Sequence, residues 1–272
     1  MGIFIDFKSR SLPLMKIFYD LFRIFFIGIC AVAMVLQTKA VFGLPLEPGI
    51  LEGFIFGGTI FGYHFTHPER HFRVIAFGAG AAGALCFVAW ARSFHLVLIA
   101  AFPVLFWLAY YGFRRPGNRV GLRTWAQAKP LTVATAWAWV TVLLPLPTDM
   151  WVLAIPVFLT RAAFVYALAL AYDFSDMDYD RLKGLSTLAQ SMEASSNFSL
   201  INWALVLSGV FVALGYFTGV YTSSHVMLIC LSLGFSAWFI HFILKKSAWH
   251  AFHKTLIDAL LPFQSLLILL LR

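Results

Sequence analysis

The apolar run from Trp151 to Tyr172 is followed directly by the acidic stretch Asp173-Phe-Ser-Asp176-Met-Asp-Tyr-Asp180-Arg-Leu-Lys183-Gly184. A helix turns by about 100° per residue, so Asp173, Asp176 and Asp180 fall within roughly 60° of one another and share one face. Stacked carboxylates repel one another, and nearby hydrocarbon strengthens the repulsion. A cation is therefore expected on this stripe. Oxygen ligands of this kind suit Mg²⁺, which proteins hold by one or two carboxylates plus substrate phosphates.

The composition indicates an integral membrane protein. Of the 272 residues, 61% are apolar and only 12% are charged, whereas a soluble protein is nearer half apolar and a quarter charged. The net charge of +8 does not indicate a nucleic-acid partner, because the basic residues lie in short connectors between apolar runs, as membrane topology predicts.

Nine apolar segments are long enough to cross a bilayer, which takes about 17–25 residues. We expect a single multi-pass membrane domain over residues 1–272, all-α, with the longest connectors after the fourth and sixth helices. The first segment lacks a good small-residue cleavage site and is expected to stay as a membrane helix. The nine predicted helices are 14–36, 50–67, 72–91, 95–113, 130–147, 150–172, 199–219, 223–244 and 255–271.

The distribution of Lys and Arg predicts the orientation. With the N-terminus inside and the C-terminus outside, Lys39, Arg92 and Arg272 lie outside, Arg23 and Arg161 lie within helices, and the other fifteen lie inside. This asymmetry follows the positive-inside rule. We therefore expect the acidic stretch to face the cytoplasm, in the cell (inner) membrane. An intramembrane Arg161 is expected to face the bundle interior or a polar cavity, or alternatively to form an ion pair that packs helices.

A second motif ends the second predicted helix, with the sequence Tyr63-His64-Phe-Thr-His67-Pro68-Glu69-Arg70-His71. Its histidines have the spacing of the three aspartates, four helices earlier. This correspondence predicts an internal repeat of helices 2–5 and 6–9, with the site between the halves. Pro68 disfavours helical geometry at the preceding residue, so the helix can end there.

The acidic stretch, in its place after the sixth helix, resembles the second Asp-rich motif of the UbiA superfamily of intramembrane prenyltransferases. Asp173, Asp176 and Asp180 stand in the aspartate places, and Gly184 with Thr187-Leu188 matches the Gly-x-x-Thr-Leu that often follows. Helix count, orientation and motif placement agree over nearly the whole chain. The resemblance implies a UbiA-like helical bundle with a central cavity, where Mg²⁺ bridges the Asp motifs to a prenyl diphosphate.

The first motif departs from the family pattern Asn-Asp-x-x-Asp-x-x-x-Asp. Tyr63 stands in the Asn place, and His64, His67 and His71 stand in aspartate places. Imidazole suits Zn²⁺, Fe²⁺ or Mn²⁺ better than Mg²⁺, so a transition metal at this His cluster is an alternative cofactor. Protonated histidines could instead contact the diphosphate directly. Four basic residues could do the same, namely Arg70, Arg73, Arg114 and Lys183.

These features predict a divergent UbiA-like prenyltransferase that moves a prenyl group from a polyprenyl diphosphate to an aromatic or lipid acceptor. Mg²⁺ and basic side chains would neutralise the leaving diphosphate, and aromatic side chains would line a dry cavity around the allylic cation. The expected catalytic and metal-binding residues are Asp173, Asp176 and Asp180.

Three alternatives stay open. Loss of the first Asp motif favours a catalytically inactive, isoprenoid-binding membrane protein. A membrane metal oxidase would instead use the histidines predicted inside, which are His64, His67, His71, His241, His250 and His253. A transporter could use intramembrane charge and a repeat.

Overall fold

The computed structural model describes residues 13–65, 70–91, 94–111, 113–115, 118–120, 128–177, 188–245 and 253–272. These residues form long helices joined by short connectors. The helices are α1 (Pro13–Val41), α2 (Ile50–His64), α3 (Arg70–Trp90), α4 (Phe94–Tyr111), α5 (Ala128–Ala138), α6 (Trp151–Ser175), α8 (Ala194–Phe217), α9 (Ser223–Leu244), α10 (His253–Asp258) and α11 (Leu260–Leu269).

Each of the nine predicted segments corresponds to a helix or a broken helix. The prediction of 223–244 coincides with α9, and α6 continues three residues beyond the predicted 172. The second helix was predicted too long, because α2 ends at His64 rather than at residue 67. Pro68 follows four residues later, which agrees with the preference for helices to end before a proline.

Two of the helices are interrupted. The end of α5 widens into a π-helical turn, Trp139–Leu143, and the last predicted helix is divided into α10 and α11 at Ala259. Counting each interrupted helix as one, the described residues contain nine helices. Five of them contain stretches long and apolar enough to cross a membrane, namely Leu21–Val41, Phe72–Trp90, Thr148–Ser175, Ala194–Phe217 and Ser223–Leu244.

The connector after α4 corrects the all-α prediction in one detail. Strands β1 (Phe113–Arg115) and β2 (Asn118–Val120) pair antiparallel, with Arg114 opposite Arg119. The sequence between them, Pro116-Gly117, is a turn signal. A polar connector can form such a hairpin because it lies outside the apolar segments.

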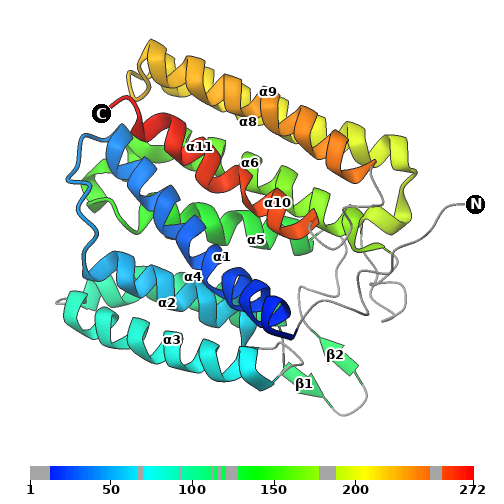
Figure 1. The fold of residues 1–272 in the computed structure, drawn as a ribbon. Helices are drawn as coiled ribbons and strands as arrows, with labels where there is room; N and C mark the ends of the chain where they lie inside the picture. The colour runs from blue at the N-terminus through cyan, green and yellow to red at the C-terminus, as the bar shows by residue number, and fades with distance from the viewer. Residues whose placement is uncertain are drawn as a thin grey trace, which may run out of the picture.

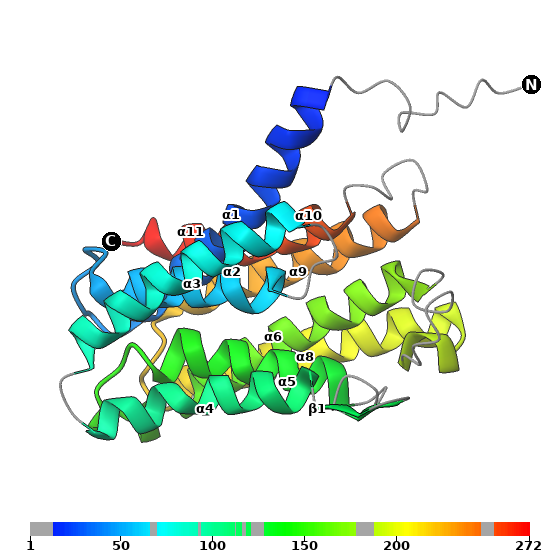
Figure 2. The same cartoon turned by 90° about the horizontal axis from the view of Figure 1, so that it is seen from below.

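The helices form a bundle in which successive neighbours run from α4 through α5, α6, α8, α9, α11, α1 and α2 to α3. Figure 2 shows α4, α5, α6 and α8 on one side and α1, α2, α3 and α11 on the other. The π-helical turn after α5 joins the two sides, since it contacts both α1 and α6. The first turns of α1 extend beyond the other helices (Figure 2).

The middle of the bundle contains a buried polar network centred on Arg161, whose side chain is 2% exposed. Its guanidinium donates to the Gln37 Oε1 atom at 2.9 Å, the Met34 carbonyl oxygen at 3.2 Å and the Thr141 hydroxyl at 3.4 Å. Ser265 also donates to Gln37 Oε1, at 3.1 Å. Arg161 thus faces the bundle interior as predicted. The partners found in the described part of the chain are neutral, so the alternative of an ion pair is wrong there.

Candidate functional site

The candidate site lies at the end of the bundle where α2 and α6 end and where α5 and α10 begin (Figure 1). Helix α6 is an apolar helix whose last turn contains Asp173, and Asp176 caps its C-terminus with φ −99° and ψ 4°. The backbone leaves the helical conformation at this cap. The two aspartates are therefore one turn apart at the helix end.

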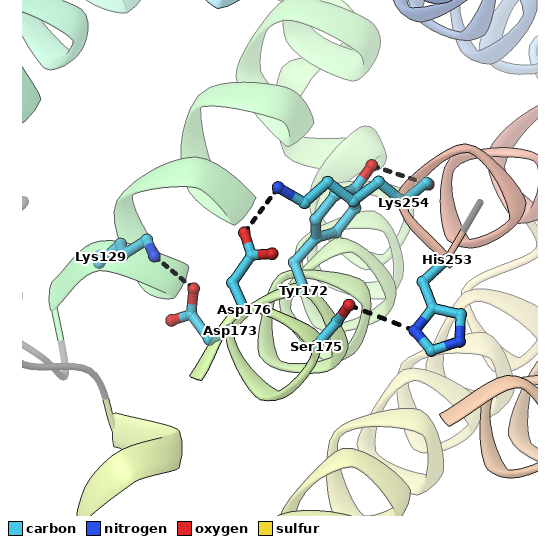
Figure 3. A network of polar contacts seen from close by, with 7 residues as sticks. All are labelled: Lys129, Tyr172, Asp173, Ser175, Asp176, His253 and Lys254. Atoms are coloured by element: carbon cyan, nitrogen blue, oxygen red, sulfur yellow. Dashed lines mark hydrogen bonds and ion pairs between the residues drawn. The ribbon is translucent and has the colours of Figure 1, made fainter. Parts of the chain in front are cut away.

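Asp173 is paired with a lysine from α5. Lys129 Nζ lies 2.5 Å from Asp173 Oδ1, and the two side chains are 18% and 4% exposed. Lys129 is the second residue of α5, so the pair ties the start of α5 to the end of α6 (Figure 3). A buried carboxylate is stable as an anion only when it is paired, and Lys129 supplies that charge.

Asp176 is paired with a lysine from α10. Lys254 Nζ lies 2.8 Å from Asp176 Oδ2, and here the side chains are 38% and 23% exposed. Figure 3 shows the two ion pairs on neighbouring turns of α6. The two aspartates therefore meet cations that come from different helices.

The start of α10 is also held in place through its backbone and its neighbours. The Tyr172 hydroxyl donates to the backbone carbonyl of Lys254 at 2.9 Å, and Ser175 Oγ lies 3.5 Å from His253 Nδ1 (Figure 3). Thr255 is within hydrogen-bond distance of the Tyr19 hydroxyl in α1, at 3.2 Å. Three consecutive residues thus anchor α10 to α6 and α1.

The structure describes only part of the predicted site. Of the aspartate stripe it brings Asp173 and Asp176 together, and Asp180 lies outside the described residues, as do His67 and Lys183. The backbones of Arg70, His71 and Arg114 are described, but their side chains are not. Arg73 is exposed on α3.

The first motif is represented by Tyr63 and His64. His64 is buried, and its ring lies tilted against that of Phe72, with 5.5 Å between the ring centroids. The Tyr63 hydroxyl accepts a hydrogen bond from Trp137 Nε1 at 2.9 Å, and the two rings meet edge to face. This contact links the end of α2 to α5, so the residue in the family's Asn place lies beside an aromatic ring.

Sequence reasoning missed Lys129 and Lys254 as site residues. The only signal in the sequence is that both are among the basic residues predicted on the cytoplasmic side of the membrane. Their pairing with α6 was not predictable from spacing, because they lie 44 residues before Asp173 and 78 residues after Asp176.

The described part of the site offers carboxylate oxygens, which are donors of the kind that Mg²⁺ takes. Asp173 and Asp176 offer carboxylate oxygens one turn apart, and Mg²⁺ needs only one or two such ligands plus substrate phosphates. Among the residues that the structure describes, no three His, Cys, Asp or Glu side chains group in a way that could hold a metal ion. A His-based transition-metal centre therefore depends on residues outside them.

The fold is similar to that of a solved digeranylgeranylglyceryl phosphate synthase, with a TM-score of 0.58 and 12% sequence identity, over 95% of this chain and 98% of that one. No protein-family model matches the chain, and no curated protein matches it in sequence.

The class that fold and composition define is an integral membrane helical bundle whose fold is similar to that of this synthase. The predicted resemblance is thereby confirmed at the level of the fold, which is as far as a likeness at 12% identity extends.

Proposed function

We propose that this protein is a divergent intramembrane prenyltransferase, which transfers a prenyl group from a polyprenyl diphosphate to a lipophilic aromatic or lipid acceptor. The observation that supports this most directly is the pair Asp173 and Asp176 at the end of α6, within a bundle that has the fold of a prenyltransferase. These two carboxylates, with Asp180, are the proposed Mg²⁺ ligands.

In the proposed reaction the C–O bond between the prenyl group and the diphosphate breaks, and the electron pair leaves with the diphosphate. The acceptor then forms a bond to the prenyl carbon and loses a proton. Mg²⁺, when bound, would neutralise charge on the leaving diphosphate. The proposed diphosphate-binding side chains, which donate to its oxygens, are Arg70, Arg73, Arg114, Lys183, His64, His67 and His71.

The membrane provides a setting for both substrates. We propose that all nine helices span it with the N-terminus inside, because the Lys and Arg distribution predicts that orientation. The site at the ends of α2 and α6 would then meet the polar diphosphate head group of the donor at the cytoplasmic surface. The prenyl tail of the donor and the lipophilic acceptor would lie in the bilayer.

A second candidate function is that of an isoprenoid-binding protein without transferase activity. Two observations favour it. The first motif has histidines in its aspartate places, and each of the two described aspartates already forms an ion pair with a lysine. This protein would bind the isoprenoid portion of a lipid without using a metal.

Transfer of label distinguishes the two candidates. Membranes containing the protein, with native lipid extract as the acceptor source, would be incubated with radiolabelled prenyl diphosphates of several lengths and Mg²⁺. A prenyltransferase moves the label into a new lipophilic product, and the Asp176→Asn variant does so at least about tenfold more slowly, equivalent to about 1.4 kcal/mol. Label that binds the protein but stays on the diphosphate would favour the non-catalytic candidate.

A further inference from the structure

The two ion pairs at the end of α6 differ in their exposure to solvent. The side chains of Lys129 and Asp173 are 18% and 4% exposed, whereas those of Lys254 and Asp176 are 38% and 23% exposed. A solvent-exposed ion pair is weak, because water and salt screen it. A buried pair is costly to separate, since each partner would be left as an uncompensated charge. The Asp176 pair is therefore the one that can exchange its cation.

The backbone around Lys254 is held by neighbouring helices, and the charged group of its side chain lies several bonds away from that backbone. Tyr172 holds its carbonyl oxygen, and the residues on either side, His253 and Thr255, contact Ser175 and Tyr19. The ammonium is carried on a flexible four-carbon stem. It can thus leave Asp176 for another anion nearby without any displacement of α10.

We propose that Lys254 is an exchangeable counter-cation, which holds Asp176 before substrate binds and moves to the diphosphate oxygens when a divalent cation takes Asp176. This inference rests on the proposed function and assigns a diphosphate-binding residue outside the Asp-rich and His-containing motifs. Lys129 has the other role: it stays at Oδ1 of Asp173 and holds α5 against α6, while a metal ion would be held through the other oxygen of that carboxylate.

In the proposed exchange, Asp176 and Lys254 each have an oppositely charged partner both before and after substrate binds. A single ammonium and a metal ion compete for Asp176, because both need its oxygens. The incoming diphosphate brings several anionic oxygens, and Lys254 can bind these with its three N–H donors. The lysine is thus expected to oppose metal binding before the diphosphate arrives and to favour diphosphate binding afterwards.

The first test measures metal binding alone. Mn²⁺, a paramagnetic ion that takes the same oxygen ligands as Mg²⁺, would be titrated into the purified full-length protein in detergent, and free Mn²⁺ followed by electron paramagnetic resonance. Lys254→Met should bind Mn²⁺ about three- to fivefold more tightly than the original protein, since the competing cation is gone. Equal or weaker Mn²⁺ binding by this variant would overturn the proposal.

The second test adds the diphosphate. With saturating Mg²⁺, Lys254→Met should bind a labelled, non-hydrolysable prenyl diphosphate about tenfold more weakly, because it lacks one charge-assisted contact. Unchanged binding of this analogue would show that Lys254 does not move to the diphosphate. If the original protein bound no analogue at all, the proposed function itself would be wrong, and the Mn²⁺ titration would still report on the competition at Asp176.

The matched control is Lys245→Met. Lys245 is exposed at the end of α9, on the same end of the bundle, and none of the ion pairs seen in the described part of the chain involves it. This variant removes the same charge and should leave both affinities unchanged. A change as large as that of Lys254→Met would assign the effect to overall charge and overturn the proposal. Thermal unfolding of both variants verifies that they fold.

Discussion

Lys129 Nζ lies 2.5 Å from Asp173 Oδ1, and this buried ion pair joins the first turn of α5 to the last turn of α6. Replacing Lys129 by Met would leave the Asp173 carboxylate buried without this cation. We expect the free energy of unfolding to fall by about 3 kcal/mol, which thermal unfolding in detergent would measure.

The double variant Lys129→Met/Asp173→Asn is the control for that prediction. It removes the buried negative charge together with its partner, so it should recover most of the lost stability. A double variant as unstable as the single one would mean that the contacts of the lysine stem, rather than the ion pair, hold α5 in place.

The network around Arg161 leads to a contrasting prediction. All three of its acceptors have another contact: Gln37 Oε1 accepts from Ser265, the Thr141 hydroxyl donates to Trp137, and the Met34 carbonyl accepts from Thr38. Arg161→Met should therefore change the free energy of unfolding by less than about 1 kcal/mol.

Removing the hydrogen-bond acceptor of Arg161, rather than Arg161 itself, should lower the free energy of unfolding further. Gln37→Leu takes away the 2.9 Å acceptor of the Arg161 guanidinium and leaves a buried cation less well paired, at a cost of about 1–3 kcal/mol. Thermal unfolding of the two variants side by side tests this order. If Arg161→Met is the more damaging variant, the guanidinium contributes more through packing than the hydrogen bonds indicate.

The contact between α2 and α3 depends on glycine at position 57. A Cβ atom there would clash with the carbonyl oxygen of Ala79 and lie 2.9 Å from the Cα atom of Gly83. Gly57→Ala should push the two helices apart and cost about 1–3 kcal/mol. At the adjacent Gly58 a Cβ atom would meet nothing within 4 Å, so Gly58→Ala should be neutral or slightly stabilising. Equal thermal stability of the two variants would contradict this account of the contact.

Much of the fold was predictable because a membrane helix must be apolar over a fixed length. That constraint located α9 at both ends and α6 to within a few residues. It could not locate the π-helical turn at Trp139–Leu143 or the break at Ala259. Both lie within apolar sequence, and they depend on how each helix packs against its neighbours rather than on its own composition.

The candidate site was predictable only for the residues that are close in sequence. The spacing of Asp173 and Asp176 showed that they share a helix face, and the structure places them one turn apart. Their partners Lys129 and Lys254 come from α5 and α10. Only the tertiary arrangement brings those helix starts to the end of α6, so no local pattern could have identified them.

Binding of a prenyl diphosphate at the end of α6 is the central claim, and it can be measured without knowledge of the acceptor. A labelled, non-hydrolysable prenyl diphosphate would be titrated into the purified protein in detergent, with Mg²⁺ and with a chelator, alongside Asp176→Asn and Asp180→Asn. We predict binding that requires Mg²⁺ and that weakens at least about tenfold, near 1.4 kcal/mol, in each variant. Absence of binding with any divalent metal, or binding equal in all three proteins, would contradict the claim.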